Sequence, residues 1–221
     1  MDGGIWAAFL GASVLLTLMP GPDILFVIAQ SVSGSPRDGS AVALGLCTGL
    51  LAHISAAALG VSAVVYRSSA AIEAVEFLGA AYLLYLAWQA WRSSSIPAAE
   101  AGHGEVEAAP AETGGSRPTF GRLYRRGILM NVMNPKVSLF FIAFLPQFVT
   151  PGGGPVAVQL AVLGVTFLLQ ALAIFHVVAL AAGKLGRQWI RGTAARRRTA
   201  RMEAAVYVLL AAYMLLMHVG G

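Results

Sequence analysis

The stretch Pro20-Gly21-Pro22-Asp23 interrupts an apolar run that extends from about Ile5 to Val32. A run of that length can cross a bilayer, whose hydrocarbon core is about 30 Å thick. Two prolines and a glycine in the middle of the run remove helix hydrogen bonds, and Asp23 places a carboxylate where burial is costly. The stretch therefore predicts a membrane helix that is broken at mid-span.

A second interruption, Asn131-Val132-Met133-Asn134-Pro135-Lys136, lies in the apolar run from about Gly127 to Val149. Pro22-Asp23 and Pro135-Lys136 are 113 residues apart, and each lies near the middle of the first apolar run of its half. We interpret the chain as two three-helix halves whose broken first helices meet at one site.

Composition places the chain among membrane proteins. Of the 221 residues, 57% are hydrophobic and only 11% are charged, and the mean hydropathy is +0.73. The expected fold class is an all-α membrane protein with six transmembrane helices, because the apolar blocks are each about 20 residues or longer. The six predicted spans are Ile5–Val32, Ser40–Tyr66, Ala70–Trp91, Arg122–Val149, Pro155–Gly183 and Met202–Val219.

Charge predicts the orientation of these spans. Thirteen of the 15 Lys and Arg residues fall in loops on one face, Arg67 alone lies on the other, and Lys136 lies within a span. Basic loops stay cytoplasmic, so both termini are expected outside. The net charge of +5 is explained by a lipid surface, which these residues flank, and no nucleic-acid partner is expected.

The composition divides the chain into three parts. Residues 93–118 are rich in Ala, Glu, Gly, Ser and Pro and have almost no large apolar side chains. They are expected to form a flexible cytoplasmic linker between a first repeat, residues 1–92, and a second repeat, residues 119–221. Because three spans per half is an odd number, the halves insert in opposite orientations, as in inverted-repeat transporters.

The two prolines also predict the local structure at each break. Proline suits the first position of a helix, so Pro22 and Pro135 can each begin a new half-helix, with Gly21 and Asn134 as the capping residues. Each half-helix points free N–H groups and its positive dipole end at the protein centre. Two such ends that converge make a site for an anion.

Asp23 and Lys136 each follow one of these prolines, and together they suit an amino acid. A substrate carboxylate can meet the N–H groups and Lys136, and a substrate ammonium can meet Asp23. Asn131, Asn134 and Ser138 lie on roughly one helix face and extend the polar lining. The alternative is a structural ion pair beside packing kinks, but two equivalent breaks that each carry a charge favour a transport pathway.

Other ionisable residues are candidates for proton coupling besides Asp23. His53 lies midway along the second predicted span, where an imidazole can relay a proton, although a hydrogen-bonded structural histidine is an equal alternative. Glu73 and Glu76 share a face near the outer end of the third span, where solvated carboxylates are the simpler interpretation. No cluster of His, Asp and Glu indicates a metal, a cofactor or an enzyme active site.

Gly45 and Gly49 form a GxxxG motif, which permits close helix packing. The motif does not say whether the partner helix belongs to the same subunit or to a second copy. A homodimer is therefore one of the arrangements it allows.

Several stretches match a known pattern: Met19–Asp23, Gly45–Gly60, Leu78–Leu83, Phe120–Arg122, Asn131–Lys136, Phe140-Phe141 and Leu145–Phe148. Through these stretches the chain resembles the LysE/RhtB family of bacterial amino-acid exporters over essentially its whole length. The resemblance implies an inner-membrane carrier driven by the proton gradient. Family members commonly have Asn where this chain has Asp23, and the superfamily includes proposed cadmium exporters. A divalent-cation exporter is therefore one alternative, and a non-transporting scaffold is another.

Overall fold

The computed structural model describes residues 3–19, 21–61, 69–95, 118–185, 201, 204–213 and 215–216, which form helices and connecting turns without a strand. In the first half, the elements are α1 (Gly3–Leu18), α2 (Pro22–Ser33), α3 (Pro36–Ala56) with its π-helical extension η1 (Ala57–Val61), and α5 (Ser69–Ser95). The start of α3 follows the expected chemistry, because Pro36 occupies its first turn and the Ser35 side chain accepts a hydrogen bond from the Asp38 N–H.

The second half begins with α6 (Phe120–Val132) and α7 (Pro135–Leu139). The chain then passes through a π-helical segment, η3 (Phe140–Phe144), and a 3₁₀ turn, η4 (Leu145–Phe148), before α8 (Val156–Leu185). A shorter apolar helix, Ala204–Tyr213, follows. Most of the predicted linker, residues 96–117, lies outside the described residues, as do Arg67 and the basic residues between Arg187 and Arg198.

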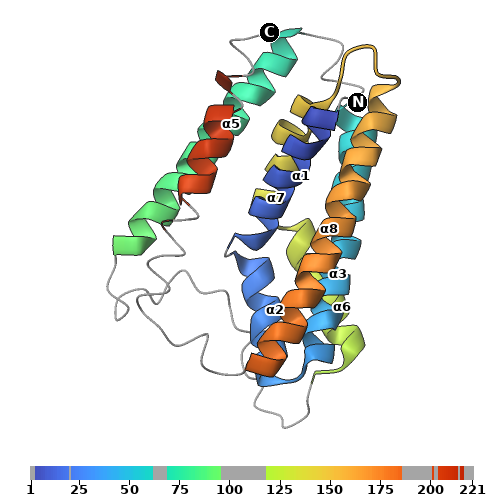
Figure 1. Ribbon diagram of the computed structural model, residues 1–221, viewed down its shortest axis with the longest axis vertical. Helices are drawn as coiled ribbons and strands as arrows, with labels where there is room; N and C mark the ends of the chain where they lie inside the picture. Colours follow the sequence, from blue (N-terminus) through green and yellow to red (C-terminus); the bar gives the residue numbers. More distant parts are fainter. Residues whose placement is uncertain are drawn as a thin grey trace.

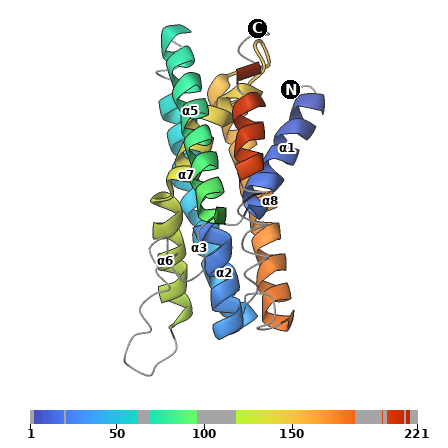
Figure 2. The same cartoon turned by 90° about the vertical axis from the view of Figure 1, so that its left-hand side faces the viewer.

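Corresponding elements of the two halves run in opposite directions (Figures 1 and 2). In Figure 1, α1 and α2 descend, α3 rises and α5 descends, whereas α6 and α7 rise, α8 descends and the helix Ala204–Tyr213 rises. The first turn of α1 and the last turn of that final helix therefore lie at the same end of the molecule.

Both predicted interruptions are present. α1 and α2 meet at a bend of 54°, and α6 meets the segment Pro135–Phe148 at 49°. Pro36–Gly60 and Val156–Lys184 are long and apolar enough to cross a membrane, and the two bent pairs raise the candidate spans among the described residues to four. The predicted spans Ala70–Trp91 and Met202–Val219 coincide with α5 and with the helix Ala204–Tyr213, but they are not among these four.

The GxxxG motif packs α3 against α6 of the same chain. A Cβ on Gly45 would lie 3.0 Å from the Gly127 Cα, and a Cβ on Gly127 would lie 3.1 Å from the Gly45 Cα. A Cβ on Gly49 would lie 2.8 Å from the Asn131 Cβ. Small residues thus allow the two backbones to touch, as in other tightly packed membrane helices. The helix that packs against the GxxxG motif, which the sequence did not identify, is therefore α6.

Phenylalanines fill the core beside the second break. Phe140 and Phe141 of η3 contact Phe167 of α8 at centroid distances of 5.0 and 5.3 Å. Phe148 of η4 contacts Phe9 of α1 at 5.2 Å. The π-helical turn rotates these side chains relative to a regular helix, and such turns are frequent at functional sites. This cluster fixes the upper half of the second broken helix against both α1 and α8.

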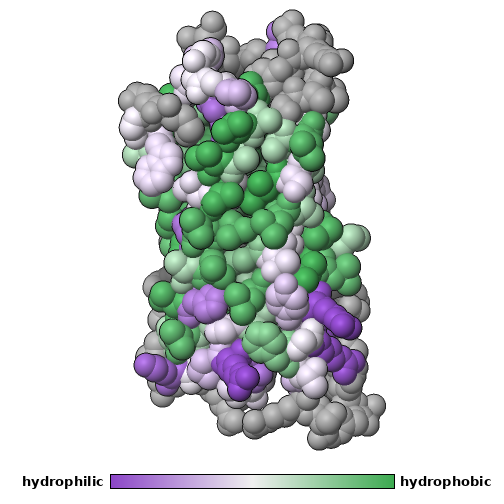
Figure 3. Space-filling model, turned by 90° about the vertical axis from the view of Figure 1, so that its right-hand side faces the viewer, coloured by the Kyte–Doolittle hydropathy of each residue, from purple (hydrophilic) through white to green (hydrophobic). Residues whose placement is uncertain are grey.

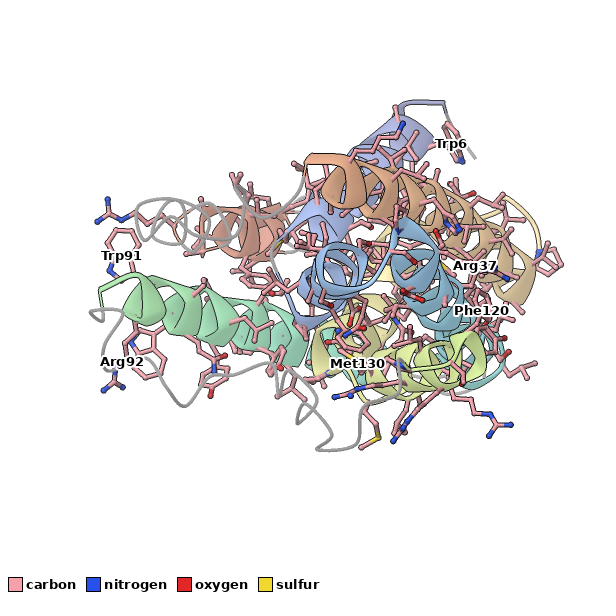
Figure 4. All side chains as sticks on the ribbon, turned by 90° about the horizontal axis from the view of Figure 1, so that it is seen from below. Trp6, Arg37, Trp91, Arg92, Phe120 and Met130 are labelled. Carbon is pink, nitrogen blue, oxygen red and sulfur yellow. The ribbon has the colours of Figure 1, made fainter. Side chains whose placement is uncertain are left out.

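The surface is consistent with a lipid environment. Figure 3 shows hydrophobic side chains across the middle of one face and hydrophilic side chains gathered toward its lower end. The described basic residues Arg37, Arg122, Arg125, Arg126 and Lys184 belong to helix ends that meet at the lower end in Figure 1. α5 lies beside η3 and the helix Ala204–Tyr213, and its exposed Trp91 and Arg92 lie at the outer end of α5 in Figure 4.

Candidate functional site

The first break ends in a helix N-terminus that carries a carboxylate. Gly21 is the N-cap of α2 in an extended conformation (φ −150°, ψ 176°), and Pro22 occupies the first turn. The first hydrogen bond of α2 runs from the Leu25 N–H to the Gly21 carbonyl, at 3.1 Å. Asp23 lies in this first turn, where the helix dipole favours a negative charge. The predicted cap and the predicted start of the half-helix are both confirmed.

The second break is capped by a side chain. Asn134 is the N-cap of α7, and its Oδ1 accepts a hydrogen bond of 3.0 Å from the Lys136 N–H. The Asn134 carbonyl accepts bonds of 3.1 Å from the N–H and the hydroxyl of Ser138. Pro135 at the first position leaves no donor unsatisfied there, because it has no N–H. This half-helix also begins where the sequence predicted.

The two breaks meet directly. Asn134 Nδ2 donates a hydrogen bond of 3.0 Å to Asp23 Oδ1, which joins residues 111 positions apart. Asn131 also hydrogen-bonds the Asp23 carboxylate through its side chain, and Lys136 interacts with it electrostatically. The Lys136 Nζ lies 3.4 Å from the position that a Cβ on Gly21 would take. The N-terminal ends of α2 and α7 therefore face each other with a carboxylate and an ammonium between them.

A cavity of about 30 Å³ opens beside these groups. It can hold water but is too small for an amino acid, so entry of a larger solute requires the helices around it to move apart. Its polar lining comes from both breaks, and its apolar lining comes mainly from α1, α3 and α8. The lining residues are Leu16, Thr17, Met19, Gly21, Pro22, Asp23, Ile24, Leu50, Asn131, Asn134, Lys136, Val137, Phe167 and Phe175.

Six of the eight predicted substrate-binding residues line this cavity. Pro135 and Ser138 do not: Pro135 is exposed at the start of α7, and the Ser138 hydroxyl turns back to the Asn134 carbonyl. Spacing along a helix predicted a common face for Ser138, Asn131 and Asn134, but the break at Met133 and Asn134 changes the helical phase between them. Pro135 and Ser138 thus support the turn and do not contribute to the cavity surface.

The proton-coupling candidates are separated in space. His53 on α3 is buried just behind the cavity, and its Nε2 lies 3.0 Å from the Asn131 carbonyl oxygen. Glu73 is exposed on α5 and does not line the cavity, and the side chain of Glu76 lies outside the described residues. Of the candidates whose side chains the structure describes, only Asp23 lines the cavity.

Sequence reasoning missed a polar contact in the first half of the site. The Gln170 Nε2 on α8 donates a hydrogen bond of 2.9 Å to the hydroxyl of Thr17, a cavity-lining residue of α1. Thr17 in turn donates to the Ser13 carbonyl at 2.9 Å. A threonine one turn before a proline break was a usable signal, because its polar side chain lies within an apolar run. The pairing of Gln170 with Thr17 was not predictable, because it joins helices 153 positions apart in the chain.

Among the described residues, no group of three or more His, Cys, Asp or Glu side chains is placed to hold a metal ion. Among the described residues that line the cavity, the charged groups are the Asp23 carboxylate and the Lys136 ammonium. Together they place a negative and a positive group in one cavity.

Comparison with known proteins gives a consistent result. Residues 14–218 match the family described as LysE type translocator. The chain is 30% identical over 209 residues to the homoserine/homoserine lactone efflux proteins of Salmonella typhi and Salmonella typhimurium, with 95% of each chain covered. It is 33% identical over 189 residues to an uncharacterized membrane protein of Vibrio cholerae, with 85% of each chain covered. No solved structure matches it.

Proposed function

The chain belongs to the LysE type translocator family, and on that premise we propose that it exports a small amino acid or a close derivative by proton antiport. Membership of this family makes it a membrane transport protein and not an enzyme. The substrate, the coupling ion and the residues that bind them are our proposal.

One observation carries the proposal: Asp23 and Lys136, each at the start of a half-helix, line the same cavity. The N-termini of α2 and α7 add positive partial charge on either side of that cavity. A substrate carboxylate binds Lys136 and the N–H groups of the first turn of α2, whose cap Gly21 uses no side-chain hydrogen bond. The substrate ammonium binds Asp23 and the amide oxygen of Asn131. Opposite charges that line one cavity recognise a zwitterion, whereas a simple anion or cation satisfies only one of them.

For the fold we propose six transmembrane helices arranged as two inverted three-helix repeats. The first repeat is residues 1–92, the second is residues 119–221, and residues 93–118 form a cytoplasmic linker. The opposite directions of corresponding helices and the equivalent bends in α1–α2 and α6–α7 support this proposal. In inverted-repeat transporters the substrate binds at mid-membrane, where broken helices meet.

We further propose that the protein is a multi-pass protein of the bacterial inner membrane with both termini outside. The described basic residues at the starts of α3 and α6 and at the end of α8 support this orientation, because positive charge is retained on the cytoplasmic side.

Homoserine and homoserine lactone are the first solutes to test, because the Salmonella relatives are named for their efflux. Both solutes carry an amine, but only homoserine carries a carboxylate. If Lys136 binds the carboxylate, Lys136→Ala should remove homoserine transport and retain much of the lactone transport. Asp23→Ala should remove both, because both amines lose their partner.

The assay is counterflow into proteoliposomes that contain the purified protein, with Gly11→Ala as a matched control because a Cβ there meets no atom within 4 Å. Asp23→Ala and Lys136→Ala should each reduce homoserine counterflow by about a hundredfold or more, since each removes a charged partner in a desolvated site. Normal counterflow in both variants contradicts the binding site. An imposed pH gradient tests the coupling: homoserine transport by the unmodified protein should respond to the gradient, and no response contradicts proton antiport.

A further inference from the structure

The second break leaves the backbone carbonyl of Asn131 without its usual helical partner. In an uninterrupted helix the carbonyl of Asn131 accepts a hydrogen bond from the N–H of residue 135. That residue is Pro135, which has no N–H. A buried carbonyl that lacks its donor is costly. At this break the carbonyl accepts backbone hydrogen bonds of shorter range, from the N–H groups of Asn134, at 3.0 Å, and Met133.

A side chain from the other half supplies a further bond. His53 belongs to α3, is 9% exposed, and places its Nε2 3.0 Å from the Asn131 oxygen. Because a carbonyl oxygen only accepts, the Nε2 must carry the proton. The ring also packs against Phe141 at a centroid distance of 5.8 Å, which fixes its orientation. The imidazole is thus held as a donor that points at the end of α6.

We propose that His53 is a positioning residue that replaces the N–H missing at Pro135 and so holds the Asn131–Asn134 turn against Asp23. The inference rests on the proposed function, because it assigns His53 a role toward that same site. The side chain of Asn131 hydrogen-bonds Asp23, and that of Asn134 does so at 3.0 Å. A shift of the Asn131 backbone therefore moves both amides relative to the carboxylate.

This role does not require His53 to change its charge. The Nε2 proton is present in one neutral tautomer and in the imidazolium, so the bond persists in both states. His53 also does not line the cavity, whereas Asn131 does. A side chain that donates from the same place without titrating should therefore serve equally well.

Two substitutions separate positioning from proton relay. His53→Gln keeps an N–H donor at about the same reach, and His53→Met keeps the volume but removes the donor. His53→Gln should retain transport to within about threefold with the pH profile of the unmodified protein, and His53→Met should raise the KM by about tenfold. His176→Met is the control, because the His176 Nδ1 lies 2.8 Å from the Leu172 carbonyl of its own helix; it should leave the KM unchanged.

A second readout does not depend on transport. The chain has two asparagines, and only Asn131 is followed by valine. Labelling with ¹³C-carbonyl asparagine and ¹⁵N-valine therefore gives a single carbonyl NMR signal, that of Asn131. Loss of a hydrogen bond moves a carbonyl signal upfield, so His53→Met should shift it upfield and His53→Gln should leave it nearly in place.

The outcomes are distinct. A wild-type KM and an unmoved carbonyl signal in His53→Met overturn the proposal. Loss of transport in His53→Gln with an unmoved signal also overturns it, in favour of a role for the His53 proton itself. If instead Asp23→Ala and Lys136→Ala transport normally while the His53→Met signal moves, the proposed binding site fails but the hydrogen bond that defines the positioning role is supported.

Discussion

The two helix breaks occupy equivalent places in the chain but are built differently. At the second break, the Asn134 side chain caps α7, and His53 hydrogen-bonds the end of α6. At the first break, Gly21 caps α2 without any side-chain hydrogen bond. Beyond the first break α2 continues as a regular helix for 12 residues, whereas beyond the second α7 gives way after five residues to π-helical and 3₁₀ turns.

This difference indicates that the two breaks have different structural roles. The second break is fixed by side chains on both sides and by the phenylalanines of η3 and η4. The first break contributes the carboxylate but has few bonds of its own, apart from the contact of Gln170 with Thr17 one turn earlier. Its main tie is the hydrogen bond from Asn134 to Asp23. The second break is therefore the template, and the first is held in position against it.

Loss of the hydrogen bond from Asn134 to Asp23 should have the largest effect on transport. Asn134→Ala removes both the cap on the Lys136 N–H and the donor to Asp23. Loss of the cap costs about 1 kcal/mol of stability, and the buried carboxylate loses a charge-assisted bond, which should reduce transport by about thirtyfold or more. Proteoliposome counterflow and thermal unfolding in detergent measure the two effects separately.

Asn134→Ser is the matched variant, because serine also caps a helix but is too short to reach Asp23. It should recover the unfolding temperature and not the transport. Full recovery of transport would show that the cap alone matters and that the two breaks are not tied through Asn134.

A change in the packing of α3 against α6 should displace the second break alone and have a smaller effect on transport. A Cβ on Gly49 would lie 2.8 Å from the Asn131 Cβ and 3.0 Å from the Ile128 carbonyl oxygen. Since Ile128 contributes backbone, Gly49→Ala must push α6 away from α3 and move Asn131, at a cost of about 1–3 kcal/mol. We expect transport to fall by about tenfold, which corresponds to 1.4 kcal/mol. Unchanged transport in Gly49→Ala would mean that the second break tolerates displacement and is not a template.

The smallest effect is expected at the first break. Gly21 has an extended backbone that any residue can adopt, and a Cβ there would lie 3.4 Å from the flexible end of Lys136. Gly21→Ala should therefore reduce transport by about twofold at most, with a slightly higher KM, because only the ammonium needs to adjust. A tenfold loss would show that the first break is as tightly fixed as the second and would remove the contrast between them.

Local chemistry made the breaks predictable. Proline at the first helical position and Gly or Asn as the cap are short-range preferences, so both half-helix starts could be read from the sequence. The pairing of Asp23 with the second break was also predictable, because two charges at mid-span need partners. Five of the lining residues follow from these two facts, and Asn131 was predicted from its spacing along the helix. The five are Gly21, Pro22, Asp23, Asn134 and Lys136.

Contacts between the halves were not predictable. The partner of His53 depends on the rotation of α3 about its axis, which is fixed by the Gly45–Gly127 contact. Ser138 was expected at the cavity because the residue spacing of a continuous helix was applied across the break at Asn134. The π-helical turn at Phe140–Phe144 has no sequence signal that separates it from an ordinary helix, since it arises from the packing of phenylalanines against α1 and α8.

The contact between Gly45 and Gly127 has a mechanical consequence. α3 and α6 come from different halves, yet their backbones touch, so they cannot be drawn apart without opening a void. If the cavity opens alternately to the two sides of the bilayer, α3 and α6 must move together as one rigid unit. The boundary between the moving units therefore lies within each half of the chain, and not at the junction between the two halves.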